Sequence, residues 1–279
     1  MRDQHPLLPY KEYEKVGLEV REDLDGRALW IIFNRPTKMN SLSWPLTTAL
    51  QEICDALMLN RRIRVVIFAG NGRNFSAGLD FESKDTDVTD VPATSRYFGQ
   101  RNYSLTVQKV KSLSQMTIAL VHGSTVGVGF AISCACDVRI AGTSFRCSIG
   151  ANRMGLSGGE GGLSWMLPRL IGTTHSNELL ATHRWMDSQK ALRTNLVSDV
   201  VSEAELRNTG LALAKDMLAM TASGLLYTKQ LILLNQNGVT LQGTFAAEDA
   251  TQMAGAAEPE VLDVMRGFQS TITKGRSKI

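Results

Sequence analysis

Two glycine-containing turns say most about how this chain folds: Phe75-Ser76-Ala77-Gly78-Leu79-Asp80 and Gly123-Ser124-Thr125-Val126-Gly127-Val128-Gly129. Each follows an apolar run of β-strand type, Arg64 to Ala69 in the first case and Thr117 to Val121 in the second. The second turn leads into a segment of helical character. We expect turns of this kind to aim two backbone N–H groups at one point, where they would stabilise negative charge on a carbonyl oxygen.

Two further landmarks lie before and after these turns. One is Asn34-Arg35-Pro36-Thr37-Lys38-Met39-Asn40-Ser41-Leu42, and the other is Met154-Gly155-Leu156 with the later Leu167-Pro168-Arg169-Leu170-Ile171-Gly172. A single glycine motif is weak evidence, because glycine is the ordinary residue of tight turns. Four landmarks in this order, within the span from Val20 to Phe268, resemble those of the crotonase (enoyl-CoA hydratase/isomerase) superfamily.

The resemblance implies an α/β fold and a thioester site. It implies a crotonase-like β/α spiral core over residues 1–200 and a helical C-terminal trimerisation region over residues 201–279, and hence a homotrimer or a dimer of trimers. By position, the oxyanion donors are the backbone N–H groups of Leu79 and Val128. The family usually has glycine at position 128; valine keeps the donor, but its bulk would narrow the hole. The resemblance also implies an acyl-CoA thioester as the substrate and no metal or other cofactor.

The chain departs from the hydratases of this family at two positions. Hydratases resemble one another in two glutamates that hold and activate water, and the matching residues here are Ala131 and Ala151. Alanine cannot transfer a proton. The two-carboxylate mechanism of water addition is therefore not expected in its usual form.

One acid remains in this part of the chain, Glu160, within the glycine-rich segment 155–162. An apolar run from Leu163 predicts that Glu160 lies near the start of a helix, whose dipole favours the carboxylate. Burial in an acyl pocket has the opposite effect and raises the pKa. A carboxyl group tuned in this way suits general acid–base catalysis. A helix N-terminal acid without a catalytic role is the alternative.

A single carboxylate beside an oxyanion hole suits the movement of a proton from one carbon to another. Peroxisomal-type Δ3,Δ2-enoyl-CoA isomerases look similar, with one glutamate in this segment that matches Glu160 after a shift of one residue following Gly155. Dienoyl-CoA isomerases also have an acid here, and a second one where this chain has Ala151. Isomerisation or atypical hydration of an enoyl-CoA in fatty-acid metabolism is therefore expected. The alternatives are thioester hydrolysis or decarboxylation, and a non-catalytic CoA- or RNA-binding homologue.

The resemblance also implies residues that border the coenzyme A: Lys38, Asn40, Ser41, Ala77, Gly78, Asp80 and Gly127. Lys38 is either a phosphate contact or a solvated surface lysine. Asp80 is expected to support the first turn without taking part in the chemistry. His122 is expected to be a structural group at a strand end, and no role is assigned to Glu248.

Composition sets outer limits on function. The 279 residues are 43% hydrophobic with a net charge of +3 and no long Lys/Arg block, which argues against nucleic acid as a partner. Cysteines 54, 134, 136 and 147 lack metal or redox spacing, so we expect buried thiols and a reducing compartment. Without a signal region or an eighteen-residue apolar run, a soluble protein is expected. The ending Ser277-Lys278-Ile279 resembles a peroxisomal signal, which predicts a peroxisomal protein in a eukaryote and a cytoplasmic one otherwise.

Periodicity predicts the remaining elements. A β-hairpin is expected over 16–34 with its turn near Asp25-Gly26, then a helix with Ser43 as its N-cap, Pro45 in its first turn and a buried stripe. The stripe consists of Leu46, Leu50, Ile53 and Leu57. Strands are expected at 63–69, 117–121, 137–141 and 196–201, and helices at 94–113, 188–195, 203–219, 222–235 and 258–268. The polar segment 84–94 is expected to be a loop at the mouth of the site.

Overall fold

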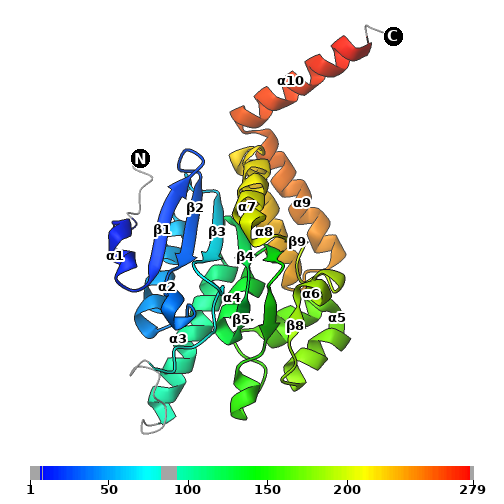
Figure 1. Ribbon diagram of the computed structural model, residues 1–279. Helices are drawn as coiled ribbons and strands as arrows, with labels where there is room; N and C mark the ends of the chain where they lie inside the picture. The colour runs from blue at the N-terminus through cyan, green and yellow to red at the C-terminus, as the bar shows by residue number, and fades with distance from the viewer. Residues whose placement is uncertain (1–6, 8, 83–92, 277–279) are drawn as a thin grey trace. The chain divides into compact units, whose positions relative to one another are not determined.

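The computed structural model describes residues 7, 9–82 and 93–276 (Figure 1). The chain divides into two compact units, Met1–Lys215 and Asp216–Ile279. The boundary lies inside helix α7, Glu203–Leu218. Most of the predicted loop at 84–94 lies outside the described residues, and so does Ser277-Lys278-Ile279.

A six-stranded sheet runs through the first unit in the order β1-β2-β3-β4-β6-β9 (Figure 1). The strands β1 and β2 pair antiparallel, and every other neighbouring pair is parallel. β2, β3 and β4 are almost entirely apolar and fully buried, as expected of parallel strands covered on both faces. The strands are β1 Leu18–Asp23, β2 Ala28–Phe33, β3 Val65–Gly70, β4 Met116–Val121, β6 Val138–Gly142 and β9 Asp199–Val201.

The first hairpin and the helix after it confirm the sequence predictions. Leu24, Asp25 and Gly26 have φ values of 51°, 58° and 74°, which place the turn where the Asp-Gly pair predicts it. Helix α2, Trp44–Met58, begins after Ser43 and carries a proline in its first turn. Ser43 is the N-cap residue of this helix. Its carbonyl accepts a hydrogen bond from the Thr47 N–H (3.0 Å), and its side chain makes no capping hydrogen bond. All four residues of the predicted stripe are fully buried.

Helices and a small second sheet complete the first unit. α2 packs on α3, α3 on α4, and α4 on α5. The small sheet has the order β5-β7-β8, and only its first strand, β5, directly follows β4 in the chain. The helices are α1 Tyr10–Glu14, α3 Ala93–Lys111, α4 Gly127–Ala135, α5 Leu163–Ala181 and α6 Ser188–Arg193, with 3-10 turns at Pro36–Lys38 and Ala151–Met154; the short strands are β5 Ser124–Val126, β7 Arg146–Ser148 and β8 Met186–Asp187.

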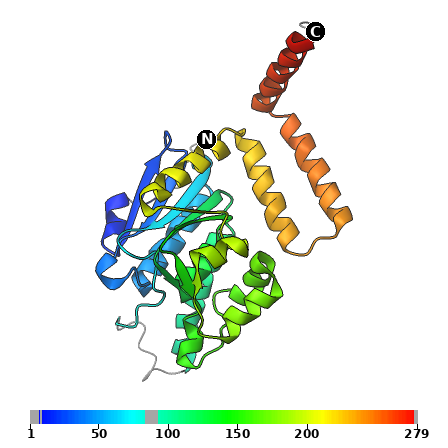
Figure 2. The same cartoon turned by 45° about the vertical axis from the view of Figure 1, so that its right-hand side comes forward.

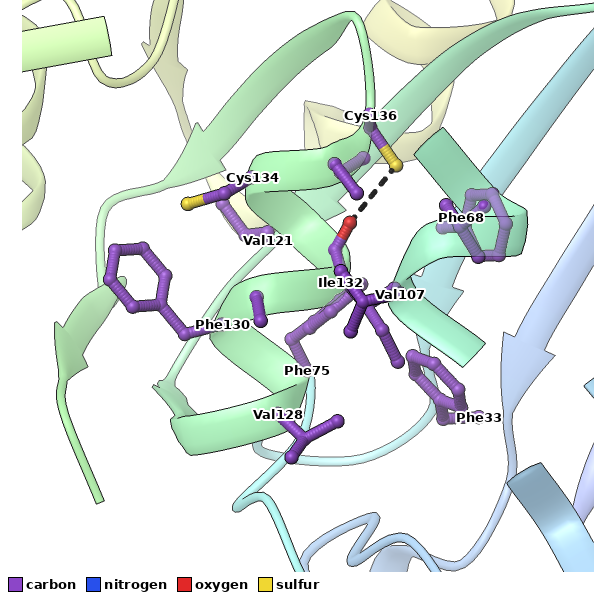
Figure 3. Packing of buried hydrophobic residues seen from close by; sticks show 14 of the residues in the cluster. Phe33, Phe68, Phe75, Val107, Val121, Val128, Phe130, Ile132, Cys134 and Cys136 are labelled. Atoms are coloured by element: carbon purple, nitrogen blue, oxygen red, sulfur yellow. Dashed lines mark hydrogen bonds between the residues drawn. The ribbon is translucent and has the colours of Figure 1, made fainter. Parts of the chain in front are cut away.

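Helix α4 is buried along its whole length and forms the centre of the hydrophobic core (Figure 3). The rings of Phe33 and Phe75 meet edge to face beside it, with centroids 5.3 Å apart. The Cys136 thiol donates to the Ile132 carbonyl at 3.5 Å (Figure 3). All four cysteines are buried and free, which confirms the prediction of unpaired thiols. Burial raises the pKa of Cys134 to about 11, so this thiol stays protonated at neutral pH.

The second unit is helical, as predicted. It contains the end of α7 and the helices α8 Ala222–Gln236, α9 Leu241–Ala256 and α10 Pro259–Arg276. α8 and α9 run side by side (Figure 2). The trimerisation role of this region stays a prediction. Of the helices described, no single one is long and apolar enough to cross a membrane, although α7 and α8, which are bent relative to each other, satisfy that length and composition test as a pair.

Candidate active site

The first turn of the sequence analysis, residues 75–80, follows β3 and is held against the second. The Phe75 N–H donates to the His122 carbonyl at 2.9 Å. Gly78 has a φ of +88°, and a Cβ on it would lie 2.9 Å from the Val126 carbonyl oxygen. Both the conformation and the close approach require glycine at this position.

The second turn, residues 123–129, contains β5 and the beginning of α4. Ser76 and Thr125 form an isolated parallel bridge, in which the Val126 N–H donates to the Ser76 carbonyl at 2.9 Å. A Cβ on Gly129 would lie only 2.6 Å from the Ser76 Cβ, and Gly127 has a φ of +55°. The two turns therefore lie in direct backbone contact.

The two predicted donor groups, the N–H of Leu79 and the N–H of Val128, lie at the contact of the turns. The hydrogen bonds on either side of Leu79 use the Gly78 carbonyl and the Asp80 N–H, both with Leu42, at 2.7 and 3.1 Å. Val128 is the second residue of α4, so its N–H has no partner within the helix. Among the residues described, neither N–H has a protein acceptor.

The valine at position 128 places its bulk in the core. Val128 is only 2% exposed and belongs to the buried hydrophobic cluster around α4 (Figure 3). The side chain and the backbone donor of this residue thus have separate environments. The extra volume relative to glycine is taken up by packing.

Glu160 lies beside the second turn. Its Oε1 accepts a long hydrogen bond from the Ala151 N–H (3.3 Å), and a Cβ on Gly127 would lie 3.3 Å from the same oxygen. Burial raises the pKa of the Glu160 carboxyl above its ordinary value, and the backbone N–H groups of Ala151 and Gly150 oppose that effect. The residue lies just before α5, and its carbonyl accepts from the Leu163 N–H (2.9 Å).

Ala131 and Ala151, which occupy the positions matched to the hydratase glutamates, both adjoin the Glu160 segment. Ala131 is fully buried in α4, and a Cβ on Gly161 would lie 2.8 Å from its Cβ. Ala151 donates its N–H to Glu160 itself. Within the described part of the chain, no second carboxylate contributes to the raised pKa of Glu160.

Asn40 is buried (1% exposed) and joins three parts of the site. Its Oδ1 accepts from the Arg35 N–H at 2.8 Å, and its Nδ2 donates to the carbonyls of Asn71 (2.9 Å) and Asn74 (2.7 Å). Its own carbonyl accepts from the Ser76 hydroxyl at 2.8 Å. The side chain is therefore fully engaged with the protein and fixes the approach to the first turn.

Asp80 is buried and forms an ion pair with Arg35 at 2.7 Å, while its Oδ1 accepts from the Glu82 N–H at 3.2 Å. This arrangement ties the end of the first turn to the segment after β2. Arg35 also donates to the Ser41 carbonyl at 2.7 Å.

The other residues predicted to border coenzyme A lie either at the surface or in the region around the two turns. Lys38 is half exposed and forms an ion pair with Glu82 at the surface. Ser41 is buried, and the Ala77 N–H donates to the Met39 carbonyl at 3.0 Å. Gly78 and Gly127 lie where the two turns touch. Contact with coenzyme A stays a prediction for all of them.

Sequence reasoning missed two connections, the Arg35–Asp80 ion pair and the contact between Gly127 and Glu160. The first joins an arginine and an aspartate from two motifs that had been considered separately. Their opposite charges were the signal in the sequence that could have suggested this ion pair. The second depends on the path of residues 155–162, which no local pattern determines.

His122 holds the bases of the two turns together. Its Nε2 lies 2.9 Å from the Gly72 carbonyl oxygen, and burial lowers its pKa, so the ring stays neutral at pH 7. A cavity of about 180 Å³ adjoins this ring; it is lined by residues of β3, β4 and α7, and neither Leu79, Val128 nor Glu160 is among them. No group of three or more His, Cys, Asp or Glu side chains in the described segments is arranged to hold a metal ion.

Comparison with known sequences extends this picture. The chain matches the enoyl-CoA hydratase/isomerase family model over residues 26–260. It is 30% identical to the probable enoyl-CoA hydratase echA12 of Mycobacterium bovis. The alignment extends over 226 residues and covers 80% of this chain and 79% of that protein. It is also 26% identical to the mitochondrial Delta(3,5)-Delta(2,4)-dienoyl-CoA isomerase of Dictyostelium discoideum, over 75% of each.

Comparison with solved structures identifies the same family. An enoyl-CoA hydratase homologue from Thermobifida fusca, solved in complex with acetoacetyl-CoA, matches with a TM-score of 0.79 and 26% identity. The match covers 89% of this chain and 98% of that one. The predicted superfamily and fold are thus confirmed: this chain has the crotonase fold and belongs to the enoyl-CoA hydratase/isomerase family.

Proposed function

We propose that the protein is an enoyl-CoA isomerase in which Glu160 is the only acid–base group. The observation that carries this proposal is the position of its carboxylate, beside Gly127 and Ala151 and next to the turn that bears the Val128 N–H. Isomerisation needs one group that removes a proton and returns it elsewhere. Water addition in the family's usual form needs two carboxylates.

The proposed reaction begins with a 3-enoyl thioester whose carbonyl oxygen accepts from the N–H groups of Leu79 and Val128. The Glu160 carboxylate removes a proton from C2, and the electron pair moves through the carbonyl to give a dienolate. The two N–H groups stabilise the oxygen that carries the new charge. Glu160 then returns the proton to C4, so that the double bond moves from C3–C4 to C2–C3.

The environment of Glu160 supports this role. Burial raises the pKa of its carboxyl, which makes the carboxylate a stronger base than a solvated glutamate. The glycines around it leave no side-chain bulk between the carboxylate and the second turn. The relatives with coenzyme A chemistry in their names, among them an isomerase, and the homologue solved with acetoacetyl-CoA support an acyl-CoA substrate.

The test is incubation of the protein with 3-enoyl- and 2-enoyl-CoA of several chain lengths, followed by chromatography and mass spectrometry. We expect interconversion of the two isomers at constant mass. In deuterated water, exchange at C2 and C4 should depend on Glu160, because one carboxyl handles both positions. A product heavier by one water would identify a hydratase, and free coenzyme A would identify a hydrolase. Either result without isomer formation would overturn the proposal.

A further inference from the structure

A buried arginine lies at the carboxyl end of α4, opposite to the end that bears the Val128 N–H. Arg139, in β6, is 6% exposed. Its Nη1 donates to the carbonyls of Ser133 (3.2 Å), Cys134 (3.4 Å) and Cys136 (2.6 Å). Its Nε donates to the carbonyl of Leu196 at 2.7 Å. Three of its four acceptors thus belong to the last turn of α4 and the residue that caps it.

The guanidinium charge has no carboxylate partner among the residues that the structure describes. A buried charge without a partner is costly, unless other groups of opposite polarity surround it. Here those groups are the carbonyls at the negative end of the α4 dipole. The helix has nine residues, which at 1.5 Å per residue is about 13 Å between the charge and the opposite end.

We propose that Arg139 is a positioning residue for the oxyanion hole, an inference that rests on the proposed function. It acts in two ways. Its forked donors fix the carboxyl end of α4 to β6 and to the segment before β9, and so fix where the helix begins. Its positive charge also favours negative charge at the amino end of the same helix, where the thioester oxygen accepts from Val128.

Two variants separate the two effects, and one matched variant serves as the control. Arg139→Lys keeps the charge and loses the fork, whereas Arg139→Met keeps an unbranched apolar side chain and loses both the charge and the donors. The control is Gln115→Met. Gln115 is 4% exposed and its Nε2 donates to the carbonyls of Leu57 (2.7 Å) and Asn60 (3.0 Å) at the carboxyl end of α2, a helix that carries no proposed donor.

The measurement is the enolate absorbance of bound acetoacetyl-CoA as a function of pH, with the binding of butyryl-CoA, a saturated thioester, measured beside it. At an effective dielectric constant of about 20, a unit charge at this distance changes an ionisation equilibrium by about five- to tenfold. We expect Arg139→Met to lower the ratio of enolate to keto form at a given pH by about that factor and Arg139→Lys to lower it less. Butyryl-CoA affinity should stay unchanged in both variants. Gln115→Met should reduce thermal stability and leave the enolate fraction as in the wild type.

The outcomes distinguish this inference from the function on which it rests. If the wild type binds acetoacetyl-CoA as the enolate and Arg139→Met does so equally well, the positioning role is wrong and the isomerase proposal stands. If the wild type neither binds acyl-CoA nor forms the enolate, both fail together. Should Arg139→Met not fold, Arg139→Lys decides, because an enolate fraction equal to that of the wild type would then overturn the inference. A loss in Gln115→Met equal to that in Arg139→Met would also overturn it.

Discussion

The two turns proposed to carry the oxyanion donors and the segment that leads to Glu160 differ in exposure and in how they are held. Backbone bonds hold the turns to each other, and the first turn also to Leu42 and to His122, which follows β4. Asn40 and Arg35 support the first turn through side-chain contacts. The segment 153–159 is mostly exposed. A Cβ on its Gly155 would meet nothing within 4 Å among the described residues, whereas one on Gly158 would overlap the Leu180 carbonyl oxygen.

The difference shows which part of the site depends on side-chain identity. The proposed donors are main-chain N–H groups, so they do not depend on which side chain position 128 carries. An acid depends on its side chain, and here the acid is at position 160 while positions 131 and 151 carry alanine. We therefore expect such a donor pair to be compatible with acids at different positions of the chain, and the predictions below test the turns and the acid separately.

Removing the acid should have the largest effect. Glu160→Gln keeps the shape and the hydrogen-bond acceptor but cannot accept the proton, so we expect isomerase turnover to fall by about a hundredfold to ten-thousandfold. Acyl-CoA binding should be largely retained, because the donors and the pocket are unchanged. Turnover by product chromatography and affinity by calorimetry check the two expectations.

The matched control is Glu52→Gln, at an exposed position of α2. It removes the same charge far from the two turns in sequence and should leave turnover unchanged. Wild-type turnover in Glu160→Gln would remove this residue from the mechanism and leave the role of a helix N-terminal acid.

Crowding the acid from the second turn should have the next largest effect. In Gly127→Ala the new Cβ would lie 3.3 Å from Glu160 Oε1 at a φ of +55°. A displacement of a catalytic group by a fraction of an ångström to an ångström lowers activity by about ten- to a hundredfold. Gly238→Ala is the control, because Gly238 also has a positive φ (+89°) and its Cβ would meet nothing within 4 Å among the described residues. Equal losses of activity in the two variants would assign the effect to backbone strain alone.

Much of the fold could be predicted because its signals are local. The stripe of α2, the Asp25-Gly26 turn and the apolar strands each follow from periodicity or turn chemistry within a few residues. The contact of the two turns could be expected because they contain glycines that the geometry requires, such as Gly78. The donor role of the Leu79 and Val128 N–H groups came from the family resemblance and stays a prediction. The Glu160 contact with Gly127 and the cap of Arg139 on α4 could not, because they join segments whose separation in space is determined only by the packed core.

Loosening the brace of the turns should have a moderate effect on activity and a clear one on stability. Asn40→Ala leaves the Arg35 N–H and the carbonyls of Asn71 and Asn74 without their partner, which should lower the free energy of unfolding by about 3 kcal/mol. Activity per folded molecule should fall severalfold, because the first turn loses its support. The control is Asn60→Ala, which removes acceptor bonds to the Arg62 and Ile63 N–H groups away from the turns. Urea unfolding and turnover check both variants, and an equal effect on turnover would contradict the bracing role.

The smallest expected effect is on stability as a function of pH. Burial raises the pKa of Glu160 in the folded state, against the opposing N–H groups of Ala151 and Gly150, so the folded protein holds this proton more tightly than the unfolded chain. The resulting stabilisation is fully present below the ordinary glutamate pKa of about 4.3 and is lost as the pH rises through the raised value. Glu160→Gln carries no such titration. Its stability relative to the wild type should therefore increase with pH and level off above the raised pKa.

The slope of that difference is the informative quantity, since a change in packing or hydrogen bonding would shift the variant by the same amount at every pH. Thermal melts of the two proteins between about pH 4 and pH 8 measure it, within the range where a shifted carboxyl titrates. The same raised pKa should move the acid limb of the pH–rate profile to higher pH, because the carboxyl group must be ionised to act as a base. A constant difference in stability together with an unshifted acid limb would mean that Glu160 titrates as a solvated glutamate. Burial would then not tune this carboxyl group, and the proposed difference between the backbone donors and the acid would be wrong for the acid.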